Sequence, residues 1–417
     1  MVNVAGEIEA QLPRELLELI RAAGELAADK GQSLYLVGGA VRDLFLGRPN
    51  LDLDLVLEGD APSLARELAK LRGGKVLTHP RFCTATISQG TISLDLVTAR
   101  SETYAKSGAL PAVKPGTIQD DLFRRDFTIN AMAAHLDPAR FGELVDPYGG
   151  KGDLDRSLVR VLHQGSFKDD PTRIWRAIRY EQRLGLRLEP DTETLLRRDV
   201  VMMDRVSGDR LRHELEHILQ EDHPEKAIYR AEELGTLQQL LPSLEGNGWL
   251  AERYERARQA SPDPRPESIL YLALLTWRLG AEQLKAFIQR LRFGREEART
   301  LLDIPGLKKA LPALEDQELL SSHICRLLER HRPQTILAAA LATDSGMVKQ
   351  QLALYLSNLR FVAPSLDGDD LKQMGVPPGK RLGWLLQALK DARLDGKVTT
   401  RKGEQELVRQ WLIESKR

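Results

Sequence analysis

Residues 36–59, LVGGAVRDLFLGRPNLDLDLVLEG, decide the fold of this chain. A short apolar segment ends at a Gly-Gly pair, a helical segment follows, and a second apolar segment contains Asp52 and Asp54. This order of strand, Gly-Gly, helix and strand predicts an α/β unit, in which the backbone N–H groups around Gly39 can bind an anion at the helix start. Arg42 lies in the first turn of that helix and can reach the same anion.

Asp52 and Asp54 are separated by one residue inside an apolar run, so on a strand their side chains point to one face. The leucines around them are expected to pack behind the pair: Leu51, Leu53 and Leu55. Two adjacent carboxylates repel and are costly to desolvate, and a divalent cation between them removes both penalties. Mg²⁺ takes oxygen ligands and keeps positions for phosphate oxygens. The alternative is a pair of surface aspartates on an edge strand, which the preceding Gly-Gly and helix disfavour.

The same string closely resembles the head signature of class II nucleotidyltransferases, the family of tRNA CCA-adding enzymes and bacterial poly(A) polymerases. The resemblance implies that Gly39 and Arg42 bind the incoming nucleotide and that Asp52 and Asp54 hold Mg²⁺. No G-x-G-x-x-G occurs here, so a dinucleotide-binding fold is not supported.

A second motif, FRRDFTINAMAA, occupies residues 123–134. Arg124 and Arg125 offer fixed donor forks that suit a triphosphate. Asp126 and Asn130 can orient an arginine or contact a ribose. The alternative is a charged helix start, capped by Asp126, ahead of an apolar helical run. The string RRDFTINA resembles the family's second motif and implies nucleotide binding, without deciding which arginine touches the nucleotide.

A third motif, DDPTRIWRAIRY, occupies residues 169–180. An aspartate followed by proline predicts a helix start at Asp170. One side of this helix is apolar and is expected to pack inward: Ile174, Trp175 and Ile178. Arginines recur every three residues and drift across the other side: Arg173, Arg176 and Arg179. The plain alternative is a capped amphipathic helix with a solvated arginine face.

Hydrogen-bond complementarity gives this helix a sharper interpretation. A carboxylate accepts from an amino group and a guanidinium donates to a ring nitrogen, so Asp170 with Arg173 would select cytosine and adenine over guanine and uracil. The resemblance implies the same: the family's amino-acid template has an aspartate and an arginine at these positions, and two further arginines that correspond to Arg176 and Arg179. Asp169 stands where the family often has glutamate. Because the cap commits one oxygen of Asp170, the other would have to read the base.

Three further segments resemble parts of the family. Residues 145–154, VDPYGGKGDL, resemble its hinge between head and neck, and residues 205–219, RVSGDRLRHELEHIL, resemble a neck segment to which we assign only a supporting role. Residues 99–120 are rich in Gly, Pro, Ser and Lys and predict a mobile loop. In the family a flexible loop here helps the pocket switch from C to A, which disfavours a CC-only enzyme. Within it, 107–113 is more similar to the A-adding and poly(A) polymerase branch.

Around these motifs the sequence predicts an α/β (α+β) head followed by an all-helical neck, body and tail. The expected helices of the head cover 8–30 and 61–71, and the expected strands cover 34–38, 51–57, 84–87 and 92–98. Asp95 on the last strand is a candidate third carboxylate, or else a plain exposed residue. The expected divisions are a head over 1–155, a neck over 156–222, and a body and tail over 223–417, with a flexible linker at 261–266.

Composition limits the function. The 417 residues suggest two to four modules, and 42% apolar with 29% charged residues is a globular balance. Lys+Arg and Asp+Glu are both 60, so any polyanion partner must meet locally collected charge. Two cysteines cannot form a disulfide framework, and no signal peptide or bilayer-spanning run is visible, so we expect a cytoplasmic protein with no membrane partner.

Together these features predict a magnesium-dependent enzyme that transfers AMP and CMP from ATP and CTP to the 3′ end of tRNA, releasing pyrophosphate. The helical half would grip the tRNA, and basic residues of the tail could form the local patch or an ordinary solvated face: Lys372, Lys380, Arg381, Lys397, Arg401 and Lys402. The rivals are an A-adding-only enzyme, a poly(A) polymerase, a catalytically silent RNA-binding module and a small-molecule nucleotidylyltransferase. The sequence leaves the oligomeric state open.

Overall fold

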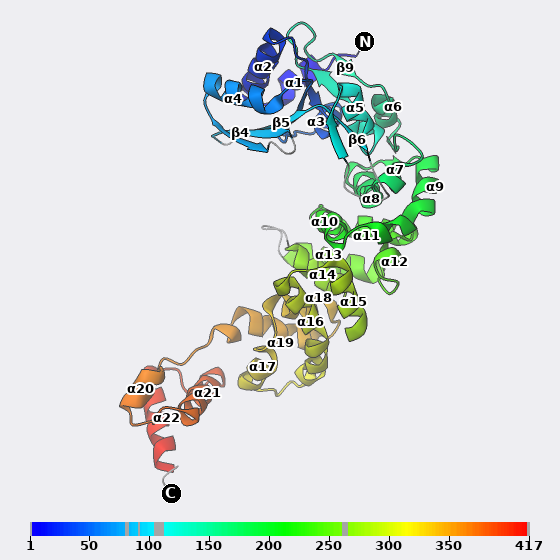
Figure 1. The fold of residues 1–417 in the computed structure, drawn as a ribbon. Coiled ribbons are helices and arrows are strands. Elements are labelled where there is room, and N and C mark those ends of the chain that lie inside the picture. Colours follow the sequence, from blue (N-terminus) through cyan, green and yellow to red (C-terminus); the bar gives the residue numbers. More distant parts are fainter. Residues whose placement is uncertain (1, 80–82, 91, 104–111, 261–265, 415–417) are drawn as a thin grey trace. The chain divides into compact units, whose positions relative to one another are not determined.

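The computed structural model describes residues 2–79, 83–90, 92–103, 112–260 and 266–414. The chain divides into two compact units, Met1–Gln239 and Leu240–Arg417 (Figure 1). The expected linker at 261–266 lies outside the described residues except for its last position, and so does most of the 107–113 segment. The finer division of the chain into a head, a neck, and a body with its tail stays a prediction.

A mixed seven-stranded sheet forms the centre of the first unit, in the order β3-β4-β5-β2-β1-β8-β9. The strands are β1 Leu34–Val37, β2 Asp54–Leu57, β3 Lys75–His79, β4 Thr84–Gln89, β5 Ile92–Thr98, β8 Ala133–His135 and β9 Leu144–Val145. All neighbours are antiparallel except β2 and β5, which run parallel and place Asp54 opposite Asp95. The expected strands are therefore present, while β3, β8 and β9 were not anticipated.

Strand alternation separates the two faces of the sheet. Leu55 and Leu57 are fully buried in the larger core. Three helices contribute to this core: α1 Ala5–Gln11, α2 Arg14–Asp29 and α4 Ala61–Arg72. Val56 faces a second, smaller core together with Ile118 and Leu122. Asp54 shares the face of Val56 because side chains two residues apart on a strand point the same way. Leu51 was expected behind the carboxylates but is exposed, because the strand begins only at Asp54.

The helices of the head are α1 Ala5–Gln11, α2 Arg14–Asp29, α3 Gly39–Phe45, α4 Ala61–Arg72, α5 Ile118–Phe123 and α6 Gly150–Asp155, with a 3₁₀ turn η2 Thr128–Asn130. The single helix expected over 8–30 is split at Pro13, which has no N–H to donate and precedes the first residue of α2.

Two further expectations in the head were wrong. The apolar residues after RRDFTIN form the short strand β8 and not a helix, because they pair with β1 in the middle of the sheet. Parts of the expected loop over 99–120 form an antiparallel ribbon, β6 Arg100–Thr103 with β7 Ala112–Pro115, and the residues between these strands lie outside the described part.

After the head, the first unit continues mainly as helices. They are α7 Ser166–Asp169, α8 Arg173–Leu184, α9 Pro190–Asp199, the 3₁₀ helix η3 Val200–Arg205, α10 Gly208–Leu219, α11 Pro224–Glu233 and α12 Thr236–Leu240. A two-residue parallel pair, β10 Leu158–Val159 with β11 Arg187–Leu188, interrupts the expected all-helical pattern. As expected, Ile174, Trp175 and Ile178 of α8 are fully buried.

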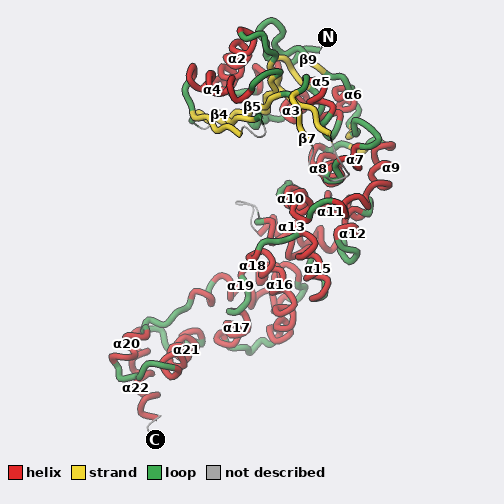
Figure 2. Tube along the Cα trace, viewed as in Figure 1, coloured by secondary structure: helices red, strands yellow, loops and turns green. Residues whose placement is uncertain are grey.

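Figure 2 shows helices and connections throughout the described part of the second unit. They are α13 Gly248–Ala260, α14 Ser268–Leu275, α15 Ala281–Leu291, α16 Arg295–Ala310, η4 Leu311–Glu315, α17 Ser321–Leu328, α18 Pro333–Ala342, α19 Gly346–Ser357, η5 Leu359–Phe361, α20 Gly368–Gln373, α21 Lys380–Leu394 and α22 Arg401–Glu414. None of the described helices is both long enough and apolar enough to cross a bilayer. The predicted fold class, a mixed α/β head with a helical remainder, is confirmed.

Candidate active site

A polar cavity of about 500 Å³ lies in the first unit. Its lining comes from the start of β2, in the middle of the sheet, and from α3, the end of α5 and α8. Apart from Asp95 and Arg179, the candidate site residues line this cavity: Gly39, Arg42, Asp52, Asp54, Arg124, Arg125, Asp126, Asn130, Asp170, Arg173 and Arg176. Residues that come from three separate motifs therefore share one cavity.

Asp52 and Asp54 form one part of the cavity wall. Asp54 is the first residue of β2. Asp52 lies two residues before it, and its N–H donates to Asn50 Oδ1 at 3.0 Å. The pKa of the Asp54 carboxyl is raised, mainly because burial disfavours its charged form. Arg125 lowers this pKa, and the carboxylates of Asp52 and Asp95 raise it further. The pair therefore carries a repulsion that a cation would relieve.

Asp95 stands beside Asp54 in the sheet register, but it does not line the cavity. Its Oδ1 accepts a hydrogen bond from Thr86 Oγ1 at 2.5 Å, across the β4–β5 pair. The structure therefore gives the candidate third carboxylate a partner inside the sheet.

The Gly-Gly pair performs two different tasks. Gly38 has φ +71° and ψ −131°, a conformation that only glycine adopts readily, and a Cβ there would lie 2.4 Å from Arg125 Nη1. Gly39 is the first residue of α3 and lines the cavity. The first glycine therefore makes room for Arg125, and the second exposes the backbone.

Arg42 is almost fully buried and its guanidinium is largely committed. Nε and Nη2 donate to the two oxygens of Asp43 at 2.8 and 2.9 Å, and Nη1 donates to Asn130 Oδ1 at 2.6 Å. The guanidinium also lies 5.4 Å from the centre of the Tyr180 ring. Arg42 therefore borders the cavity as a fixed positive group, and a ligand can use only the donors that these bonds leave.

A carboxylate that the sequence reasoning did not single out holds Arg124 and Arg125. Asp121 is fully buried, and its Oδ1 accepts from Nη2 and Nε of Arg124 at 2.6 and 2.9 Å. Its Oδ2 accepts from Nη2 and Nε of Arg125 at 2.9 and 3.2 Å. The spacing could have revealed it, because residues three and four positions apart meet on a helical turn. Glu102, also missed, accepts from Arg124 Nη1 at 3.2 Å.

Asp126 and Asn130 orient arginines. Asp126 Oδ1 accepts from Phe127 N at 2.9 Å and from Asn130 Nδ2 at 3.0 Å, and its Oδ2 accepts from Arg176 Nη1 at 3.1 Å. Burial raises the pKa of Asp126, but Arg176 and Asn130 outweigh burial and hold that pKa below its ordinary value. The residue is therefore a buried anion that links the second motif to the third.

Asp170 differs from the expected N-cap. The helix α8 begins at Arg173 with Thr172 at the cap position, two residues later than expected. Asp170 instead closes a turn, because its Oδ1 accepts from Thr172 N at 3.1 Å and from Thr172 Oγ1 at 2.7 Å. Its Oδ2 accepts from Arg176 Nη2 at 2.7 Å. Burial raises the pKa of Asp170, and Arg176 and the other donors lower it to below the ordinary value.

Arg173 is buried and lines the cavity. Nη1 donates to Ser166 Oγ and Nη2 to the carbonyl of Arg124, both at 2.7 Å. Nε has no hydrogen-bond partner among the described residues. The side chain is thus fixed at two nitrogens and keeps donor capacity at the third.

Arg179, like Asp95, does not line the cavity. Steps of three residues rotate around a helix of 3.6 residues per turn, so the third arginine of the series has turned away from the first. Arg179 lies 3.6 Å from Glu221 and 5.1 Å from the Tyr180 ring centre, and it lines a separate cavity of about 100 Å³. Tyr180, which the sequence reasoning missed, takes a place in the larger cavity.

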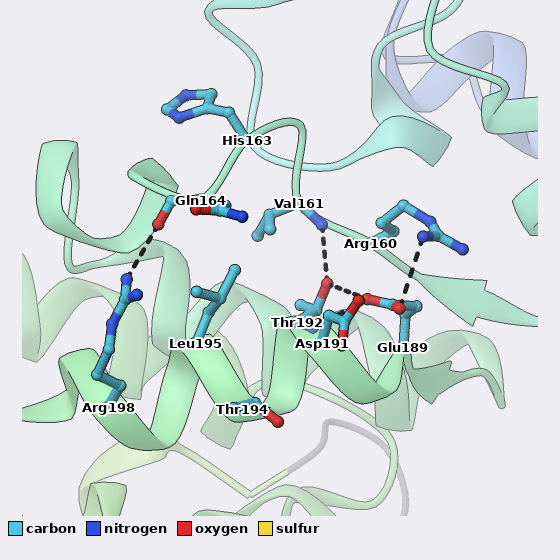
Figure 3. A pocket seen from close by; sticks show the side chains of 10 residues that line it. All are labelled: Arg160, Val161, His163, Gln164, Glu189, Asp191, Thr192, Thr194, Leu195 and Arg198. Atoms are coloured by element: carbon cyan, nitrogen blue, oxygen red, sulfur yellow. Dashed lines mark hydrogen bonds and ion pairs between the residues drawn. The ribbon is translucent and has the colours of Figure 1, made fainter.

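A second cavity, of about 410 Å³, lies between residues 160–164 and α9 (Figure 3). Its two arginines have partners in the cavity wall: Arg160 lies 3.5 Å from Glu189, and Arg198 donates to the Gln164 carbonyl at 3.1 Å. Leu195 points from α9 toward the loop (Figure 3). Glu189 and Asp191 line this cavity and are also two residues apart, but Glu189 is committed as the cap of α9, where it accepts from Thr192 N and Oγ1, both at 2.9 Å.

Only the pair Asp52 and Asp54 suits a metal ion at the larger cavity. No cluster of three or more His, Cys, Asp or Glu side chains with metal-binding geometry occurs within the described residues. Two carboxylates with a raised pKa on one of them fit a hard divalent cation whose other ligands come from water or phosphate.

Two family models match the chain. The first, the poly A polymerase head domain, covers residues 34–160, and the second, a probable RNA and SrmB-binding site of polymerase A, covers residues 185–246. The first range contains the carboxylates and the arginines of the second motif, while the third motif falls between the two.

Curated relatives match over most of the chain. An A-adding tRNA nucleotidyltransferase of Halalkalibacterium halodurans is 35% identical over 382 residues, which cover 90% of this chain and 88% of the relative. An A-adding tRNA nucleotidyltransferase of Geobacter sulfurreducens is 34% identical, with 94% of this chain covered but only 47% of the relative, so the chain spans about half its length.

Solved structures match as well. The apo form II of a CCA-adding enzyme has a TM-score of 0.84 and 33% identity, with 98% of each chain covered. The Thermotoga maritima CCA-adding enzyme complexed with a tRNA has a TM-score of 0.78 and 32% identity, with 99% of each chain covered.

Proposed function

Since the chain belongs to the tRNA nucleotidyltransferase family, we propose that it is an enzyme that transfers AMP from ATP to the 3′ end of a tRNA and releases pyrophosphate. The observation that carries the proposal is the single cavity that gathers an adjacent carboxylate pair, several arginines and the pair Asp170 and Arg173. These groups correspond to the three needs of the reaction: an activated hydroxyl, a bound triphosphate and a selected base.

The charge balance of the cavity supports a metal requirement. Six arginines and five carboxylates line it, so the lining alone is almost neutral. A triphosphate brings several negative charges, which such a lining does not neutralise. We infer that Asp52 and Asp54 hold Mg²⁺, which supplies charge neutralisation and lowers the pKa of the attacking hydroxyl.

The chain's own residues then carry out the transfer. One carboxylate of the pair Asp52 and Asp54 takes the proton of the tRNA 3′ hydroxyl as the hydroxyl oxygen forms a bond to the α-phosphorus of ATP. The bond from that phosphorus to the bridging oxygen breaks, and pyrophosphate leaves with both electrons of the bond. Arg124 and Arg125, fixed by Asp121, meet the charge of the triphosphate and the leaving group.

Base selection falls to the buried pair on the third motif. Asp170 accepts from the exocyclic amine of adenine, and Arg173 donates to the neighbouring ring nitrogen. A guanine or uracil edge would present a carbonyl and an N–H and leave both groups mispaired, a penalty of roughly 10⁴–10⁵ in rate for a dry site. No nucleic-acid template is needed.

Addition of CMP as well as AMP is the second candidate, and the cavity alone does not separate the two. Cytosine presents the same amine and ring nitrogen as adenine. The similar structures include complexes of a CCA-adding enzyme with ATP and with CTP, at TM-scores of 0.84 and 0.81. Among the curated relatives, three of 33–35% identity are named A-adding and four of 25–27% identity are named CCA-adding, while the solved structures named CCA-adding are 31–33% identical.

Incubation of the purified chain with tRNAs that lack one, two or three terminal nucleotides tests the proposal, with ATP and CTP supplied separately. We expect one AMP on the tRNA that lacks only the last nucleotide. CMP on the shorter tRNAs would indicate full CCA addition, and long A tails would indicate a poly(A) polymerase.

A variant with Asp52→Ala and Asp54→Ala should be inactive; if function persists in it, the chain is a binding module. Transfer to a small hydroxylated molecule without RNA would contradict the proposal.

A further inference from the structure

Asp170 accepts a hydrogen bond from Arg210, in a segment to which we assigned only a supporting role from the sequence. Arg210 lies near the start of α10, forty residues further along the chain, and its Nη2 donates to Asp170 Oδ1 at 2.7 Å. The same nitrogen lies 3.4 Å from Thr172 Oγ1. The arginine therefore binds the turn that carries the base-selecting carboxylate.

The two oxygens of Asp170 are occupied unequally. Oδ1 accepts three hydrogen bonds, two from Thr172 and one from Arg210. Oδ2 accepts one, from Arg176. A carboxylate oxygen offers about two acceptor positions, so Oδ1 is saturated and Oδ2 retains capacity. An amino group from a base would therefore meet Oδ2.

Arg210 disfavours a two-bond pair between the carboxylate of Asp170 and the guanidinium of Arg176. A guanidinium and a carboxylate prefer to bind through two parallel hydrogen bonds. Arg176 already reaches Asp170 and Asp126, and Arg210 on the other oxygen holds the pair to a single contact. Without Arg210, only Thr172 holds Oδ1 in place, and the carboxylate can turn more readily toward Arg176.

We propose that Arg210 is a positioning residue for base selection: it pins Oδ1 of Asp170 so that Oδ2 stays directed to the exocyclic amine of the base. Arg210 acts through Asp170 and makes no contact with the nucleotide in this scheme. The inference rests on the proposed function, because it assigns a source to the selectivity of the same site.

A structural role alone predicts a different outcome. The Arg210 side chain is 31% exposed, and a partly exposed ion pair contributes little to stability. Loss of such a pair would change the unfolding midpoint slightly, and it would slow the addition of every nucleotide by the same factor. Loss of a positioning contact would slow adenine addition more than guanine addition.

The matched control is Arg212→Ala on the same helix. Arg212 lies 3.3 Å from Glu216 and 3.8 Å from Asp209, both on α10. Two residues along a helix turn a side chain to nearly the opposite side, so Arg212 points away from the side that Arg210 presents to Asp170. Arg210→Ala and Arg212→Ala remove the same type of side chain from the same helix. An equal change of nucleotide selectivity in both variants would come from a change in the helix. A change in Arg210→Ala alone would come from the lost contact with Asp170.

The experiment measures kcat/KM for ATP and for GTP with the full-length chain and a tRNA that lacks its terminal nucleotide. Arg210→Ala should reduce the ratio of ATP to GTP by roughly tenfold or more, with the ratio of Arg212→Ala near that of the wild type. Arg210→Lys, which keeps the charge but not the fork, should fall between them. Arg210→Gln, which keeps an N–H donor, provides a second variant if the alanine variant does not fold, and its ratio should fall as well.

An unchanged ATP to GTP ratio in the Arg210 variants would overturn the inference, and so would an equal fall in Arg212→Ala. These results differ from failure of the proposed function, in which the wild type itself would add no nucleotide to tRNA.

Discussion

Asp121 illustrates how one buried carboxylate can organise a site without lining it. It holds Arg124 and Arg125 through separate oxygens. We expect Asp121→Asn to lower the free energy of unfolding by about 3 kcal/mol, because breaking a buried ion pair on one side leaves its partners uncompensated. The affinity for ATP should fall with it. Denaturant unfolding and ATP titration measure the two effects.

Asp120→Asn is the control for that change, since Asp120 is the exposed neighbour that caps α5 through Thr117. The same chemical change there should leave ATP affinity near that of the wild type. Equal losses of ATP affinity in the two variants would show that Asp121 has no special role in placing the arginines.

Asp54 should respond to pH and to substitution in a definite direction. Its folded-state pKa is raised, so the folded protein takes up this proton at a higher pH than the unfolded chain does. Its ionised form therefore opposes folding at neutral pH, and this penalty disappears as the pH falls through the raised pKa to the ordinary value. Without metal, Asp54→Asn should unfold at a higher denaturant concentration than the wild type at pH 7, although it is inactive.

That gain should vanish when the comparison is repeated at a pH near the ordinary value for aspartate, and Mg²⁺ should stabilise the wild type but not the variant. A variant that is less stable than the metal-free wild type at pH 7 would contradict the assigned origin of the pKa shift.

At the scale of elements, the turn from β1 into α3 is fixed by backbone conformation and by space. Gly38→Ala combines a strained positive φ with a Cβ 2.4 Å from Arg125 Nη1. We expect a loss of about 1–3 kcal/mol in the free energy of unfolding and weaker ATP binding. Gly47→Ala is matched in strain alone, because Gly47 has φ +61° and a Cβ there would meet no atom within 4 Å. It should cost about 1 kcal/mol and leave ATP affinity unchanged; weaker ATP binding in both variants would count against the space argument.

The sequence predicted elements well where the local pattern and the fold agree. The strands and helices around the Gly-Gly pair follow from apolar runs and glycine positions, and several of their side chains line one cavity. The apolar residues after RRDFTIN were misjudged because pairing with β1, a contact between distant segments, decides their structure. Helix periodicity placed Arg173 and Arg176 but not Arg179, since the rotation per residue accumulates along α8.

Partners that are remote in sequence account for the rest of the site. Asp121 could have been recognised from its spacing to the arginines, but Arg210 could not, because nothing local connects α10 to the turn at Asp170. Glu102 and Tyr180 come from an unexpected ribbon and from a helix face that looked structural. Residues within one motif can thus be predicted from the sequence. Residues of other elements that position them can be identified only from the structure.

For the whole molecule, the division into two units predicts separate thermal behaviour. The cavity lies within Met1–Gln239. A ligand that binds only the folded state of one unit stabilises that unit by mass action. Calorimetry should resolve two transitions, and ATP with Mg²⁺ should raise the midpoint of one. Asp121→Asn should lower the midpoint of that same transition. An ATP-induced shift in the transition that Asp121→Asn leaves unchanged would contradict the placement of the nucleotide site.

A crystal structure of the chain with Mg²⁺ and a non-hydrolysable ATP analogue tests the central claim most directly. We expect the adenine amino group at Asp170 Oδ2, the phosphates beside Arg124 and Arg125, and a metal ion between Asp52 and Asp54. An adenine edge turned away from Asp170 and Arg173, or a triphosphate bound elsewhere with no ion at the carboxylate pair, would contradict it.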